Sequence, residues 1–146
     1  MLPVQRGGGS VGAMSGPVDL SRLREEVSNF GPAPYLITVT ADGRPHTVAV
    51  GVDWDDRLLY AGAGSTTMVN VSERPAVSLV WPPITPGGYS LIVDGRASAD
   101  QERERVLIEP IKAVLHRRRA EGRGSDCVSV LSASSPRPDS TTASPC

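Results

Sequence analysis

Residues 60–81 read YAGAGSTTMVNVSERPAVSLVW, and this stretch decides how the rest of the chain can fold. An apolar run ends at Tyr60 and is followed by four small residues, 61–64, and three hydroxyl residues, 65–67. Pro75 must end the segment after them, because proline removes a helical hydrogen bond, and a second apolar run follows. The pattern predicts a strand, a glycine-rich turn, a short helix and a second strand.

The glycine-rich turn has two interpretations. In the first, small residues let a ligand approach the backbone, Ser65 caps the helix, and the free N–H groups of the helix start bind a phosphate. In the second, it is an ordinary connection between a strand and a helix. The residues of the turn leave both interpretations open.

Composition limits the class of protein. The 146 residues are enough for one domain with a modest core. A net charge of −1 gives no field that would attract nucleic acid, and we expect no nucleic-acid partner. With one phenylalanine, the core must consist of Val, Leu, Ile and Ala, which favours strands. Two histidines and two cysteines predict no metal site.

The sequence also carries few targeting signals. No apolar run approaches the length of a membrane span, so we expect no membrane partner. The N-terminal residues have no apolar segment typical of a secretory signal. These two observations predict a cytoplasmic protein.

Apart from the short helix, hydrophobic patterning predicts one N-terminal helix and six strands. The helix begins at Asp19, as its N-cap, and ends at Phe30 before Gly31. Asp42-Gly43 predicts a hairpin turn. Residues 105–116 fit a helical face or a strand with Pro110 at a bulge, and we favour a bent strand because an interior proline costs a helix about 3 kcal/mol. The predicted strands are 35–40, 46–52, 57–61, 76–81, 89–99 and 105–116.

These elements predict a mainly β fold, a small barrel with an N-terminal and an internal helix. We divide the chain into a disordered leader (1–17), a barrel domain (18–116) and a flexible C-terminal tail (117–146), since both termini are rich in small and polar residues. Within strand 46–52, one face carries only small side chains and suits a flat ligand, or else a tightly packed sheet.

From about Pro34 to His116 the chain resembles the flavin-binding split-barrel family typified by pyridoxamine 5′-phosphate oxidase. In the oxidases, the corresponding block reads as a strand, Tyr-Thr-Asn, a small residue, Gly-Ser-Arg-Lys, a short helix, Asn-Pro and a strand beginning Val-Ser-Leu. The matching positions in this chain are Tyr60, Gly64-Ser65, Arg74-Pro75 and Val77-Ser78-Leu79.

The resemblance implies a six-stranded split β-barrel of Greek-key type that forms a homodimer with cofactor clefts at the subunit interface. It implies FMN, or the deazaflavin coenzyme F-420, and an oxidoreductase acting on a small organic substrate. No catalytic residue is assigned. By position, the cofactor-binding residues are Thr47, Val48, Ala49, Val50, Tyr60, Ala61, Ser65, Thr66, Thr67 and Ser90.

Two departures from the family limit this transfer. Thr66 and Thr67 stand where the oxidases carry Arg and Lys, so two phosphate-binding cations are missing. The oxidases' C-terminal Trp and Arg-rich segment is also absent, which argues against synthesis of pyridoxal phosphate. The alternative is a non-enzymatic cofactor carrier or a barrel without cofactor, and some similar proteins hold haem. Cations considered as replacements are Arg44, Arg96 and Lys112.

Overall fold

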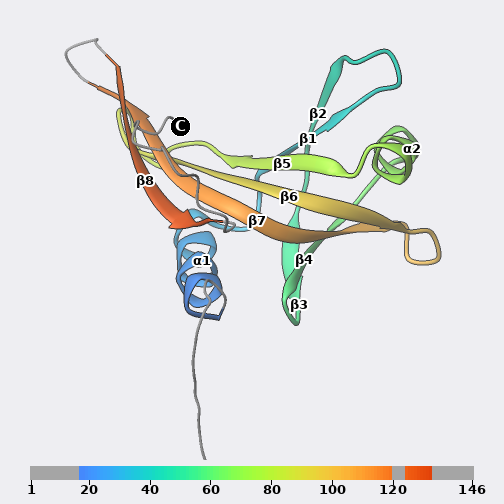
Figure 1. Cartoon of the computed structure of the whole chain (residues 1–146), viewed down its shortest axis with the longest axis horizontal. Coiled ribbons are helices and arrows are strands. Elements are labelled where there is room, and N and C mark those ends of the chain that lie inside the picture. The colour runs from blue at the N-terminus through green and yellow to red at the C-terminus, as the bar shows by residue number, and fades with distance from the viewer. Residues whose placement is uncertain (1–16, 120–123, 133–146) are drawn as a thin grey trace, which may run out of the picture.

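A curled antiparallel sheet with two helices makes up the computed structural model, which describes residues 17–119 and 124–132 (Figure 1). The helices are α1 (Pro17–Phe30) and α2 (Ser65–Glu73). The strands are β1 (Tyr35–Val39), β2 (Pro45–Ala49), β3 (Val52–Asp55), β4 (Leu58–Gly62), β5 (Ala76–Trp81), β6 (Ser90–Asp100), β7 (Arg105–Arg118) and β8 (Ser125–Leu131).

The order of the strands explains why the sheet curls. It runs β2-β1-β5-β6-β7-β4-β3, with β8 paired to β7. β2 and β3 therefore lie at opposite ends of this path, although only Val50 and Gly51 separate them in the chain. Val50 and Val52 donate backbone hydrogen bonds to Pro34 and Pro32, at 3.0 and 2.8 Å. A two-residue connection can join the two ends only if the sheet bends into a split barrel, which confirms the predicted fold class.

Strand register separates an inner face from an outer face. One row of paired residues runs across the sheet with its side chains on the inner face. This inner row is apolar and largely buried, with Leu36, Leu79 and Val93 fully inaccessible to solvent. Its members, in order across the sheet, are Val48, Leu36, Leu79, Val93, Ala113 and Leu131. The neighbouring row points outward and is apolar as well, but it is mostly exposed or half-buried. It consists of Ala49, Tyr35, Val80, Ile92 and Val114.

The two helices pack at opposite ends of the long strands. α1 lies against β8 and adds Leu23 and Val27 to the core, and α2 adds Met68 and Val71 beyond the other end of the sheet (Figure 1). The inward positions predicted for Met68 and Val71 are confirmed. Gly31 ends α1 with a φ of +99°, the left-handed conformation expected of a glycine there.

Long strands β6 and β7 connect these two ends. Their register shifts at Asp94 and Gly95, which confirms the predicted bulge. On β7, Pro110 pairs with Gly95 at this irregularity, so a proline is accommodated in a central strand. Residues 105–116 are therefore strand, as favoured from the sequence.

Several predictions from the sequence need correction. The sheet has eight strands rather than six. The predicted strand 46–52 is divided at Val50 and Gly51, and residues 53–55, predicted as a turn, belong to β3. The last strand, β8, was not predicted. The segment predicted as a flexible tail from Arg117 supplies the end of β7 and all of β8. Buried Val130 and Leu131 hold β8 in the core. Asp19 lies inside α1, not before it.

The remaining terminal predictions are not tested. The predicted leader, except Pro17, and the end of the predicted tail from residue 133 lie outside the described residues. Neither helix in the described part of the chain is long and apolar enough to cross a membrane.

Candidate functional site

The start of α2 is an open backbone site. Gly64 is its N-cap residue, and no side chain hydrogen-bonds to the cap. The first backbone bond of the helix is donated by Met68 to Gly64, so the N–H groups of residues 65–67 precede the helical ladder. A Cβ atom at Gly62 or Gly64 would meet no atom within 4 Å. The N–H groups at this helix start therefore lie outside the helical ladder and could donate hydrogen bonds to an anion.

The three hydroxyl residues at this start differ in exposure. Ser65 and Thr66 are exposed, whereas Thr67 is 2% exposed and faces the core beside Met68. The predicted cap at Ser65 is wrong, because Ser65 is the first residue of the helix. The hydroxyl of Thr67 is therefore not available to a ligand on the surface. The hydroxyls of Ser65 and Thr66 remain available on the surface.

Strand β2 presents the small face predicted from the sequence. Thr47, Ala49 and Gly51 are exposed, while Val48 and Val50 point inward and are half-buried. On β4, Tyr60 is half-buried and Ala61 is fully buried, so Ala61 offers a ligand only its backbone. Flat, small and accessible surface of this kind is compatible with a planar ring.

An ion-pair cluster lies over the ring of Tyr60. The guanidinium of Arg105 lies 4.6 Å from the centre of the Tyr60 ring. It also donates to Asp100 at 3.0 Å and to Asp55 at 3.3 Å. The hydrogen bond from Arg105 lowers the pKa of Asp100, and Asp100 in turn raises the pKa of Arg105. Sequence spacing gave no signal for this cluster, because fifty residues separate Asp55 from Arg105.

Arg105 therefore does not replace the missing phosphate-binding cations, since two carboxylates already surround it. The replacements considered from the sequence are not gathered at the start of α2 either. Arg44 lies in the β1–β2 hairpin, Arg96 pairs with Ala76 beyond the other end of α2, and Lys112 lies opposite Asp94 within the sheet.

Ser90 lies apart from the predicted cofactor residues at the start of α2. It opens β6 and pairs with His116, whereas Ala97 of the same strand bonds to Pro75 just after α2. Seven residues of strand separate Ser90 from Ala97, about 23 Å at the usual rise. Within one chain, Ser90 and the start of α2 do not form one site.

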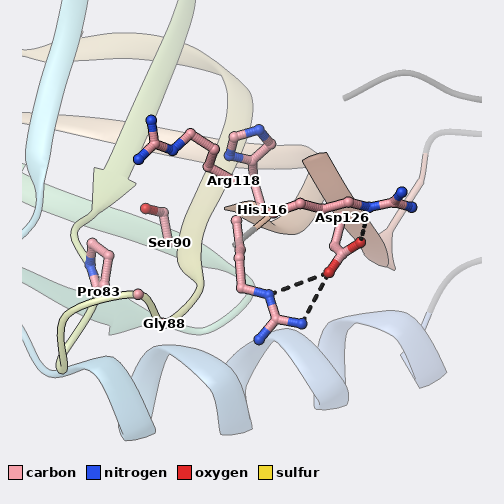
Figure 2. A pocket seen from close by; sticks show the side chains of 9 residues that line it. Pro83, Gly88, Ser90, His116, Arg118 and Asp126 are labelled. Carbon is pink, nitrogen blue, oxygen red and sulfur yellow. Dashed lines mark hydrogen bonds and ion pairs between the residues drawn. The ribbon is translucent and has the colours of Figure 1, made fainter. Parts of the chain in front are cut away.

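Around Ser90 the structure has a different pocket, of about 900 Å³ (Figure 2). It lies between the β5–β6 loop, the end of β7 and the start of β8, and its lining is rich in arginine. The lining residues are Pro83, Gly87, Gly88, Ser90, His116, Arg117, Arg118, Arg119 and Asp126. The alternation of apolar residues at 128–131 was the sequence signal that could have revealed β8 and hence this pocket.

No metal centre is present in the described ranges. Among residues 17–119 and 124–132, no group of three or more His, Cys, Asp or Glu side chains is arranged to hold a metal ion.

Comparison with known proteins agrees with this architecture. The family model named pyridoxamine 5′-phosphate oxidase matches residues 23–133, which include β8. The chain belongs to this family. An uncharacterised protein from Mycobacterium bovis is 43% identical over 115 residues, which cover 68% of this chain and 80% of the relative. A protein from Mycobacterium tuberculosis matches equally well.

Solved structures support the family fold. A Clostridium acetobutylicum protein, related to general stress protein 26 and of the pyridoxinephosphate oxidase family, has a TM-score of 0.55 at 8% identity, over 76% of this chain and 95% of that one. A haem-binding protein from Mycobacterium smegmatis has a TM-score of 0.54 at 12% identity, over 80% of this chain and 60% of that one. At such identities the similarity concerns the fold alone.

Proposed function

We propose that this member of the pyridoxamine 5′-phosphate oxidase family binds FMN or the deazaflavin F-420 and is an oxidoreductase for a small organic substrate. The observation that carries the proposal is the uncapped start of α2 beside two glycines with open space around them. Three successive N–H groups there can hold a phosphate without any cation. Family membership supports the same use of this turn.

The rest of the cofactor would lie on the exposed side of β2 and β4. Thr47 and Ala49 offer a surface without bulky groups, and Ser65 and Thr66 can donate hydroxyl hydrogen bonds near the phosphate. When bound, the isoalloxazine or deazaflavin ring supplies the hydride chemistry. The protein contributes position and backbone donors, while the Arg105 cluster holds Tyr60 in place.

A homodimer belongs to this proposal. The outer row that contains Tyr35, Val80 and Ile92 is apolar, and Tyr35 is 45% exposed. Both helices instead contribute to the inner core, so no described helix covers this row. A second copy packing there would bury the row and close the face of β2 into a cleft. The proposed location of the dimer is the cytoplasm.

The second candidate is a non-enzymatic carrier or a barrel that holds no cofactor. Burial of Thr67 and the positions of Arg44, Arg96 and Lys112 away from the start of α2 favour it, because charge-assisted bonds to phosphate are about twice as strong as neutral ones. Haem binding would be a variant of the carrier role.

Titration of the purified full chain with FMN and with F-420 separates these candidates. The proposal expects saturable binding of one of them, seen as quenched ring fluorescence, and hydride exchange with a reduced nicotinamide or an added acceptor. Size-exclusion chromatography with light scattering should show a dimer. Failure of both cofactors to bind, or a haem Soret band in the isolated protein, would contradict the oxidoreductase proposal.

A further inference from the structure

The pocket around Ser90 carries an excess of positive charge. Arg117 donates to Asp126 at 2.9 and 3.3 Å, and Arg119 donates to the other oxygen of Asp126 at 3.0 Å. One carboxylate thus faces two guanidinium groups. Arg118 adds a third, so the lining carries three positive charges and one negative charge, a net charge of +2 with His116 neutral.

Of the three arginines that line the pocket, Arg118 is the one without a partner among the described residues. It is exposed, and neither a hydrogen bond nor an ion pair joins it to another described residue. Figure 2 shows its side chain on the same side of β7 as His116. Arg117 instead donates its hydrogen bonds to Asp126. The five N–H donors of Arg118 are therefore available to a ligand.

The other two arginines are held in place rather than free. Arg117 stacks over the Tyr89 ring at 4.5 Å, and its hydrogen bond to Asp126 lowers the pKa of that carboxyl, so the pair stays ionised near neutral pH. Asp126 in turn ties β8 to the end of β7. The positive wall of the pocket is thus fixed before any ligand arrives.

We propose that this pocket is a second binding site, separate from the start of α2, for a small organic molecule with at least two negatively charged oxygens. Such a ligand would place one anionic group on Arg118 and bring its remaining charge close to Arg117 and Arg119. Ser90, the strand partner of His116, also lines the pocket, and its hydroxyl supplies a neutral donor. A volume of about 900 Å³ is within the range of sites for organic ligands and exceeds the needs of a simple inorganic ion.

Isothermal titration of the full chain with pyrophosphate and with citrate tests this site. Both probes carry clustered anionic oxygens, and their comparison distinguishes a phosphate site from a carboxylate site. The test variant is Arg118→Gln. The matched control is Arg57→Gln, which removes the same charge from an exposed turn between β3 and β4.

We expect at least one probe to bind the unmodified chain, and added sodium chloride to weaken that binding. Arg118→Gln should weaken it by about tenfold or more, the effect of one charge-assisted hydrogen bond. Arg57→Gln should change it less than about twofold, as expected for a distant exposed charge. Absence of binding by either probe, insensitivity to salt, or equal losses in both variants would overturn the proposal.

FMN titration of the same variants keeps this proposal distinct from the proposed function. Arg118→Gln should bind FMN as the unmodified chain does, because α2 lies at the other end of the sheet (Figure 1). Loss of FMN binding in this variant would show that the pocket belongs to the cofactor site and is not a second one. If FMN fails to bind at all but the anion probes do, only the cofactor proposal fails.

Discussion

The two ends of the sheet use the same motif with different charge balances. At the α2 end, Arg105 lies over Tyr60 and is bonded to Asp100. At the β8 end, Arg117 lies over Tyr89 and is bonded to Asp126. Each arginine thus combines a ring contact with an ion pair.

The neighbours of each motif set its chemistry. At the α2 end, Arg103 and Arg105 meet Asp55 and Asp100, so positive and negative charges cancel. At the β8 end, Arg117 and Arg119 share one aspartate, and Arg118 adds a further positive charge. An anion would therefore rely on backbone N–H groups at the first end and on guanidinium groups at the second. The charge balance around an arginine, more than its presence, indicates whether it can bind a ligand.

The largest expected effect is a loss of stability caused by a substitution at the β6–β7 bulge, which lies between the two ends. In Gly95→Ala, the new Cβ would lie 2.6 Å from the Glu109 carbonyl oxygen and 2.8 Å from Ile108 Cγ2. Backbone on the facing strand cannot yield easily, so we expect a loss of about 3 kcal/mol in the free energy of unfolding. Urea denaturation measures it.

Gly62→Ala is the control, since a Cβ there meets nothing within 4 Å. It should leave the free energy of unfolding nearly unchanged. Equal losses in the two variants would show that the β6–β7 bulge does not hold the two ends in register.

The second largest effect on stability is expected at the hydrogen bond that attaches α2 to β1. Asn70 Nδ2 donates to Thr38 Oγ1 at 3.0 Å, and both side chains are buried. Asn70→Ala leaves a buried hydroxyl without its donor and should cost about 2 kcal/mol in the free energy of unfolding. In the double variant with Thr38→Val, the loss should be smaller than the sum of the single losses. Additive losses would mean that this hydrogen bond does not anchor the helix.

A cation placed at the start of α2 sharpens the comparison between the two ends. Thr66→Lys adds a charge at an exposed position beside the free N–H groups, and should tighten FMN binding about tenfold. The neighbouring Thr67 is unsuitable for this test, because it is buried and a lysine there would lie in the core. Val69→Lys adds the same charge at a residue of α2 that is 54% exposed, and serves as the control. Equal FMN affinities of the two variants in fluorescence titrations would show that the phosphate binds elsewhere.

Acid sensitivity gives the smallest effect. Hydrogen bonds from Arg117 and then Arg119 lower the pKa of Asp126 below its ordinary value of 3.8. Because the folded pKa lies below the unfolded one, the ion pair stabilises the fold above about pH 4 and stops doing so as the pH falls through the folded pKa. The melting temperature of Asp126→Asn should therefore fall less steeply below about pH 4 than that of the unmodified chain. Parallel curves would contradict this, although exposure keeps the difference small.

Local signals in the sequence were sufficient for most of the fold. The Asp42-Gly43 turn, the Pro75 stop and the position of Pro110 each depend on backbone chemistry that neighbouring residues determine. β8 was missed because the sequence at 120–124 before it is polar and contains glycine, and because its pairing with β7 is a tertiary contact. Composition alone predicted a flexible tail at the residues that form β8, which is wrong.

The candidate sites were less accessible to sequence reasoning. The exposure of Thr47 and Ala49 followed from strand alternation, since side chains on a strand point alternately to the two faces. Thr67 has its side chain in the core because the helix turns it inward, and its chemical type gave no warning. The partners of Arg105 and Arg117 lie across strands, at separations that no motif encodes.

The corner at Val50 and Gly51 also bears on how the barrel is assembled. Closing a ring normally requires distant parts of a chain to meet, and the entropy lost grows with the loop between them. Here the two outermost strands of the path are neighbours in the chain, so closure requires almost no additional loop. A single proteolytic cut between Val50 and Gly51 would leave all strand pairings intact. It would nevertheless free the two edge strands, β2 and β3, to pair with other chains.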